Sequence, residues 1–143
     1  MTDLIPMIIV SLLSGLLSTM NVWTVDRSHI RFHLNDLYMI LLMTGWMIFL
    51  TYLHNYKLTE HVNVGVIAYV LIISTTFYFV RTQFLIDDKQ FLKGMIPHHS
   101  MAIQMARNIK NKTEDEKIRK LADDIITAQT NEIKLMDEIL QSK

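Results

Sequence analysis

The sequence contains no cysteine, only two prolines and four glycines among its 143 residues, and no excess of charge of either sign. Without cysteine, disulfides, thiolate zinc sites and thiol nucleophiles are excluded. The glycines form neither a phosphate-binding loop nor a flexible linker. Because the 14 lysines and arginines balance the 14 aspartates and glutamates, the composition gives no reason to expect a nucleic-acid partner.

Sequence signatures of enzymes are absent as well. The chain has no Glu-x-x-His pair of the kind that holds di-iron centres, and no His-Glu-x-x-His zinc motif. Ser100 directly follows His99, and neighbours on a helix diverge by about 100°, so these two residues are not expected to form a Ser–His dyad. We therefore do not expect catalysis.

Charged residues are scarce in the first part of the chain. Residues 1–80 carry seven, and the remaining 63 residues carry 21. This division favours a transmembrane domain over residues 1–83 and a polar helical-hairpin domain over residues 84–143.

Three uncharged windows in the first part predict three transmembrane helices. They cover about residues 4–22, 37–53 and 62–80, close to the length of about 20 residues that a membrane span needs. The connector Lys57–Glu60 is so short that the second and third spans should form an antiparallel hairpin. A signal peptide is the alternative for the first window, but no basic n-region precedes it. We therefore expect a multi-pass integral membrane protein, with the lipid bilayer as a partner.

Two helices are predicted in the C-terminal part. Asp87-Asp88 is a plausible helix start, since acidic groups stabilise a helix N-terminus. The first helix should reach about Lys110, with Gly94 and Pro97 producing either a kink or a break into a short and a longer helix.

The second helix should begin at a capping box formed by Thr113 and Glu116, and should end near Leu140. One stripe on it has helical spacing and contains Ile118, Leu121, Ile125, Ala128, Glu132, Met136 and Ile139. A single hairpin of this length has too little core to be stable alone. It should either pack on the membrane domain or pair with a second copy, as a homodimer or higher oligomer; a dimer would make a four-helix bundle.

The segment from Met95 to Met105, MIPHHSMAIQM, places two adjacent histidines among three methionines. At about 100° per residue, His98 and Met105 lie about 20° apart on a helix, and Met95 lies about 60° from His98. Met101 and His99 flank that face. Imidazole and thioether are ligands that borderline and soft metals prefer, so this segment predicts a metal site.

Structural explanations stay open beside this one. A methionine stripe at helical spacing is more often part of a core, and a histidine on such a face is usually hydrogen-bonded there. Glu132 and Gln129 lie on the apolar stripe, where a buried carboxylate needs a partner, unless both residues reach water. The other histidines are interpreted as ordinary residues near the membrane interface; they are His29, His33, His54 and His61.

The motif Asp88-x-x-Phe91-x-x-x-Met95-Ile96-Pro97-His98-His99-x-x-Ala102-Ile103-x-Met105-Ala106 resembles the signature of domain-of-unknown-function family 305. The second-helix residues Leu121, Ala122, Ile125, Gln129, Glu132, Ile133 and Met136 are similar to that family's second-helix pattern. Segments 31–43 and 81–83 also resemble a membrane-anchored subgroup with three N-terminal spans.

This resemblance implies an all-α, ferritin-like fold and, as in some members, copper binding. The ligands it implies are His98, His99, Met95, Met101, Met105 and Met136, with Asp88, Gln129 and Glu132 in support. Long members carry two His-His motifs and this chain carries one, which leaves completion of the bundle, and of a metal site, to a second subunit. Copper-binding relatives work outside the cytoplasm, whereas the positive-inside count places the C-terminal domain inside it, so the orientation stays open.

The expected function is metal binding at the membrane surface, with copper as the metal, for homeostasis or resistance. The alternative is a membrane scaffold or assembly protein whose hairpin mediates oligomerisation without metal. Transport ranks last, because no charged side chain lies deep in any predicted span.

Overall fold

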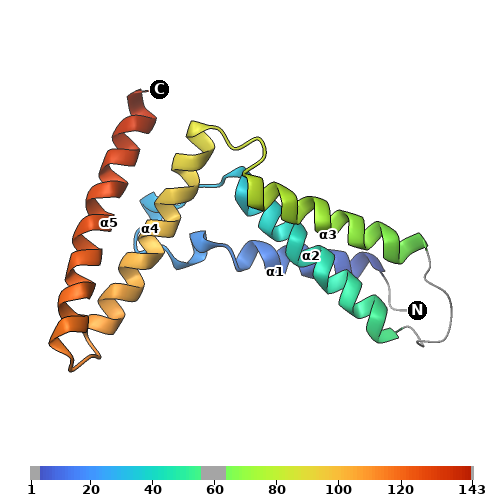
Figure 1. Ribbon diagram of the computed structural model, residues 1–143, viewed down its shortest axis with the longest axis horizontal. Helices are drawn as coiled ribbons and strands as arrows, with labels where there is room; N and C mark the ends of the chain where they lie inside the picture. Colours follow the sequence, from blue (N-terminus) through green and yellow to red (C-terminus); the bar gives the residue numbers. More distant parts are fainter. Residues whose placement is uncertain (1–3, 56–63, 143) are drawn as a thin grey trace. The chain divides into compact units, whose positions relative to one another are not determined.

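The structure, a computed structural model, describes residues 4–55 and 64–142. In this part of the chain every regular element is helical, as the sequence predicts, and there are no strands (Figure 1). The elements are α1 (Leu4–Leu17), the short 3₁₀ helices η1 (Met20–Trp23) and η2 (Arg27–His29), α2 (Leu34–Asn55), α3 (Val64–Thr82), α4 (Asp88–Lys110) and α5 (Glu116–Ser142).

The chain divides into two compact units that do not follow chain order. The first unit comprises Met1–Thr19 and Leu34–Leu85, and the second comprises Met20–His33 and Ile86–Lys143. Residues Met20–His33 are here called the connecting segment; the sequence predicts their first residues, to about residue 22, as the end of the first span and the rest as the loop between the first two spans. In the structure they belong with the C-terminal hairpin, which no local pattern in the segment indicates.

Glycines allow close helix approach in the first unit, where α2 contacts both α1 and α3. A Cβ on Gly15 would lie 3.0 Å from Ile40 Cγ2, and a Cβ on Gly45 would lie 3.1 Å from Ile73 Cγ1. Both positions therefore need the smallest side chain. The helices α2 and α3 run antiparallel (Figure 1), whereas the connector Lys57–Glu60 lies outside the described residues.

Small polar residues outnumber large apolar ones among the described buried residues of the first unit, where Tyr38 and Ile73 are the buried large apolar residues. Ser11 is fully buried, and Thr44 and Thr76 are 6% and 7% exposed. Each hydroxyl donates to the carbonyl four residues earlier in its own helix, at 2.7–2.8 Å. Large apolar side chains point outward instead, for example Ile5 at 72% and Phe77 at 60% exposure.

The expectation of three membrane spans is corrected to one among the described residues. Leu34–His54 is a 21-residue helix long and apolar enough to cross a membrane, whereas the other apolar stretches, Ile5–Leu17 and Val66–Thr82, are shorter. The helix α1 has 14 residues and spans about 21 Å, less than the roughly 30 Å of a bilayer core. It ends before residue 22 because the polar residues Ser18, Thr19 and Asn21 follow it, and such side chains compete for backbone partners. Residues 62 and 63 of the third predicted span lie outside the described residues.

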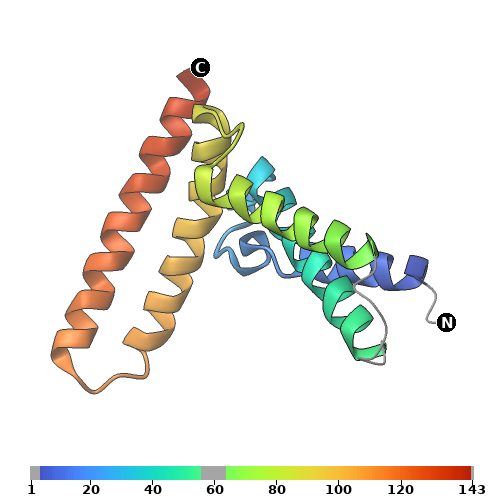
Figure 2. The ribbon, with the colours of Figure 1, turned by 45° about the vertical axis from the view of Figure 1, so that its right-hand side comes forward.

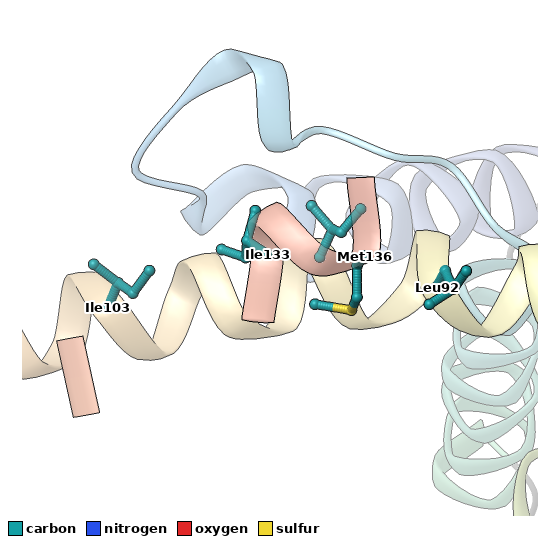
Figure 3. Close-up of a cluster of buried hydrophobic side chains, with 5 residues drawn as sticks. Leu92, Ile103, Ile133 and Met136 are labelled. Carbon is teal, nitrogen blue, oxygen red and sulfur yellow. The ribbon is translucent and has the colours of Figure 1, made fainter. Parts of the chain in front are cut away.

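The helices α4 and α5 form an antiparallel hairpin in the second unit (Figures 1 and 2). Asp87 caps α4, accepting a 2.7 Å hydrogen bond from the Gln90 N–H, so the predicted helix start is confirmed. The predicted break is wrong, because α4 continues through the fully buried Pro97 to Lys110. The core of the hairpin contains Leu92, Ile96, Ile103, Ile133 and Met136 (Figure 3).

The predicted start and buried face of α5 are both corrected. The helix begins at Glu116, and Asp115, not Thr113, receives a 2.7 Å hydrogen bond from a first-turn N–H. Its buried residues are Ala122, Ile133 and Met136. Of the predicted stripe only Met136 is among them, whereas Ile118 and Leu121 are 42% and 59% exposed. The buried face of α5 thus differs from the predicted face by about one residue. The helix carries two adjacent apolar stripes, and periodicity alone does not indicate which of them packs against α4.

Candidate metal site

His98, His99 and Ser100 are consecutive in α4 and diverge by about 100° each, so each side chain meets a different neighbour. The His98 side chain is exposed, and its Nδ1 lies 3.1 Å from Sδ of Met20 in η1. A thioether sulfur is a weak hydrogen-bond acceptor but a good ligand for soft metals. The contact therefore joins two metal-binding atoms from residues 78 positions apart.

His99 points towards α5. Its side chain is 12% exposed, and Nδ1 lies 3.1 Å from Oε2 of Glu132. The contact is within ion-pair distance but lacks hydrogen-bond geometry, so the buried Nδ1 has no hydrogen-bond partner. Burial lowers the pKa of His99 below its ordinary value of 6.5, the Glu132 carboxylate opposes this shift, and His98 adds to it. Burial thus disfavours the protonated form of His99, and the unprotonated imidazole is the form that binds a metal.

Ser100 is fully buried and contacts the connecting segment. Its Oγ accepts a 2.9 Å hydrogen bond from the Val25 N–H and lies 2.9 Å from Nδ1 of His29. The serine thus pairs with a distant histidine and not with its neighbour His99, as the helical geometry predicts. The buried Ser100 hydroxyl thus links α4 to the connecting segment.

Further contacts hold the connecting segment in place. The side-chain amide of Asn21 joins the two ends of the segment. Its Oδ1 accepts a hydrogen bond from the Arg31 N–H at 2.8 Å, and its Nδ2 donates one to the Arg31 carbonyl at 3.1 Å. The Arg31 guanidinium pairs with Asp137 of α5 at 3.2 Å. The His33 ring lies against Gly94, where an added Cβ would be 3.1 Å from the ring Cε1. Gly94 and His98 are four residues apart, so they share one face of α4.

The other predicted site residues are distributed over the hairpin. Met136 is part of the apolar core and Met95 packs against it, as the structural explanation of the methionines predicts. Met105 is 61% exposed. Met101 and Gln129 are half-buried, and Asp88 is an exposed residue of the first turn of α4. Of the predicted set, the structure joins His99 with Glu132 by an ion-pair contact and Met95 with Met136 in the core.

The donor atoms fit a soft metal better than a hard one. In the part of the chain that the structure describes, no three residues among histidine, cysteine, aspartate and glutamate gather closely enough to hold a metal ion. A site here would therefore depend on methionine sulfur beside imidazole nitrogen, which is the donor set of copper. The contact of Met20 with His98 and the orphaned Nδ1 of His99 are the two observations that fit it.

Sequence reasoning missed three residues near the His-His motif, namely Met20, His29 and His33. The two histidines had been interpreted as interfacial, and Met20 as part of the first span. The only signal for them is that two of the six histidines and a methionine occur in one short polar stretch between apolar segments. His54 is exposed in the last turn of α2, and His61 lies outside the described residues.

Comparison with known proteins extends over almost the whole chain. Residues 84–141 match the model of a family described as a domain of unknown function (DUF305). An uncharacterized protein of Acanthamoeba polyphaga mimivirus is 49% identical to this chain over 140 residues, which is 96% of this chain and 90% of the relative. No solved structure matches the chain. The chain therefore belongs to the DUF305 family, whose domain it carries in residues 84–141.

Proposed function

We propose that this protein is a membrane-anchored metal-binding protein that holds copper through His98 and His99 together with methionine sulfur. The observation that carries the proposal is the 3.1 Å approach of His98 Nδ1 to a methionine Sδ, one residue from His99, whose buried Nδ1 has no hydrogen-bond partner. The role is copper storage, buffering or resistance.

The ligand chemistry supports copper over other metals. Thioether sulfur favours Cu(I), and imidazole accepts both copper states. Carboxylate-rich clusters that would suit magnesium or calcium are absent from the described residues. A site without thiolate also tolerates an oxidising compartment.

The distribution of buried and exposed side chains in the first unit supports the proposal that this unit anchors the protein in a membrane. Its buried residues include Ser11, Thr44 and Thr76, while large apolar side chains face outward, as with Leu50 at 56% exposure and Leu71 at 61%. In water this arrangement would be unfavourable, because the outward side chains would lose the benefit of burial. In a bilayer it is the expected arrangement, with small residues at helix contacts and apolar residues facing lipid. We assign α2 as the spanning helix, with α1 and α3 packed beside it.

Metal content and Cu(I) titration of the detergent-purified protein test the proposal. The wild type should bind copper stoichiometrically against a chromophoric Cu(I) chelator, and the double variant His98→Ala/His99→Ala should lose it. The matched control is His54→Ala, which removes an exposed histidine of the first unit and should bind copper as the wild type does. Equally weak copper binding by the wild type and the double variant would contradict the proposal.

A second candidate function, oligomeric scaffolding, is favoured by a specific observation. Three apolar side chains of α5 are exposed, with Ile118 at 42%, Leu121 at 59% and Leu135 at 55%. A second copy of the hairpin packed there would bury them and make a ferritin-like four-helix bundle. Under this function, Leu121→Ser should reduce the oligomer while His98→Ala/His99→Ala leaves it intact. Sedimentation in detergent distinguishes the two.

A further inference from the structure

Among the described residues, Met20 is the methionine whose sulfur lies against a ring nitrogen of the His-His motif, at 3.1 Å from His98 Nδ1. Packing does not explain this position, because Met20 is 41% exposed and His98 is exposed. The two side chains gain little from hydrophobic burial, and the thioether is a poor hydrogen-bond acceptor. Two exposed donor atoms are thus held together by no more than a weak N–H···S contact.

The fold holds them there through the neighbours of Met20. Asn21, the next residue, is 6% exposed, and its side-chain amide accepts from the Arg31 N–H and donates to the Arg31 carbonyl. Further along the connecting segment, the Val25 N–H and His29 Nδ1 contact the buried Ser100 Oγ, two residues after His98. The backbone on each side of the donor pair is therefore anchored within the second unit.

This face of α4 also contacts His33 of the connecting segment. Gly94 lies one turn before His98 and has no side chain, so that the His33 ring lies directly on the helix. The same face thus receives two side chains from the connecting segment, Met20 and His33. By contrast, Met136 of the hairpin is buried in the apolar core at 8% exposure.

We propose that Met20 and His98 are ligands of one Cu(I) ion, so that the connecting segment, and not a second subunit, completes the metal site. This inference rests on the proposed copper-binding function and adds to it a ligand from outside the matched domain. It predicts one Cu(I) per chain, with the same ratio in monomer and oligomer.

Cu(I) competition titration of the full chain in detergent, with Met20→Leu, tests this assignment. Leucine keeps the volume of methionine and removes the sulfur, so the Cu(I) affinity should fall roughly tenfold or more while the thermal unfolding temperature stays close to that of the wild type. The matched control is Met39→Leu, which removes a 49% exposed sulfur from α2 and should leave the affinity unchanged. X-ray absorption of the copper-loaded protein should show one sulfur neighbour fewer in Met20→Leu only.

A rescue variant separates loss of a ligand from loss of structure. Met20→His restores a ligand atom at this position and should recover affinity relative to Met20→Leu, with nitrogen replacing sulfur around the copper. If Met20→Leu binds as the wild type does while His98→Ala loses copper, the inference is wrong and the proposed function stands. If the wild type binds no Cu(I), the proposed function itself is overturned.

Discussion

The Ser100 hydroxyl contacts two residues that precede it by more than 70 positions, at 2.9 Å each. Beside it, His98 and His99 meet Met20 and Glu132. The sequence drew attention to this turn of α4 through the two histidines. The role of Ser100, which follows the two histidines, could not be predicted, because the sequence does not distinguish a buried serine from an exposed one.

Ser100→Ala should destabilise the second unit by about 1–3 kcal/mol, because the Val25 N–H and the His29 ring nitrogen lose their common partner. Denaturant unfolding in detergent, followed by circular dichroism, measures the change. The matched control is Thr127→Ala, an exposed hydroxyl on α5 that bonds its own helix and should change stability by less than about 0.5 kcal/mol. Equal effects of the two variants would contradict the assigned role of Ser100.

Asp26 has a pKa below its ordinary value of 3.8, because its carboxylate accepts hydrogen bonds from the Ser28 N–H and, secondarily, from the Ser28 hydroxyl. A lowered pKa stabilises η2 above pH 3.8, and this contribution is lost as the pH falls through the lowered value. Ser28→Ala removes only the hydroxyl, so the Asp26 pKa should rise part of the way back. Carbon-detected NMR titration measures it, and an unchanged pKa would show that the side-chain bond is not formed in solution.

The contacts of the connecting segment with α4 and α5 could not be predicted from the sequence. Its two 3₁₀ helices are too short to leave a periodic pattern, and its partners lie on α4 and α5, far along the chain. Two longer elements were predicted well: α4 ends at Lys110 as expected, and α5 ends at Ser142, two residues after the predicted end near Leu140. The buried face of α5 was predicted one residue out of register, because its sequence carries apolar residues on two adjacent stripes.

Asn21→Ala should release the connecting segment while leaving the hairpin intact. The variant loses the two hydrogen bonds that join residues 21 and 31, at a cost of about 1–3 kcal/mol. Hydrogen-exchange mass spectrometry should show faster exchange in residues 20–33, with α5 unchanged. The control is Asn108→Ala, an exposed position on α4 that should change neither region. Faster exchange throughout α5 as well would mean that the segment is needed for the hairpin to fold.

The molecule as a whole combines two units with opposite distributions of polarity. The second unit has an apolar core of isoleucine, leucine and methionine, as a protein in water requires. The first unit buries serine and threonine and exposes isoleucine, leucine and phenylalanine. This contrast is the physical basis for assigning the first unit to lipid.

Leu41→Lys tests that assignment. Leu41 is 40% exposed near the middle of α2, where a lysine should oppose membrane insertion by about 2.5–3.5 kcal/mol. On a water-exposed surface the same change would cost less than about 0.5 kcal/mol. The fraction of protein that floats with vesicles after alkaline carbonate extraction should therefore drop for Leu41→Lys and stay unchanged for Leu121→Lys on α5. Equal flotation of Leu41→Lys and wild type would contradict the membrane assignment of α2.

The sequence by itself determined the all-α class, the apolar character of the first part, the helical hairpin and the family, because periodicity, hydropathy and a contiguous motif are local properties. It also marked His98 and His99 as the residues most suited to a metal. The tertiary structure decided which atoms meet these histidines. Met20, Glu132 and the connecting segment reach α4 only after the chain has folded back, and contacts between residues so far apart leave no periodic trace in the sequence.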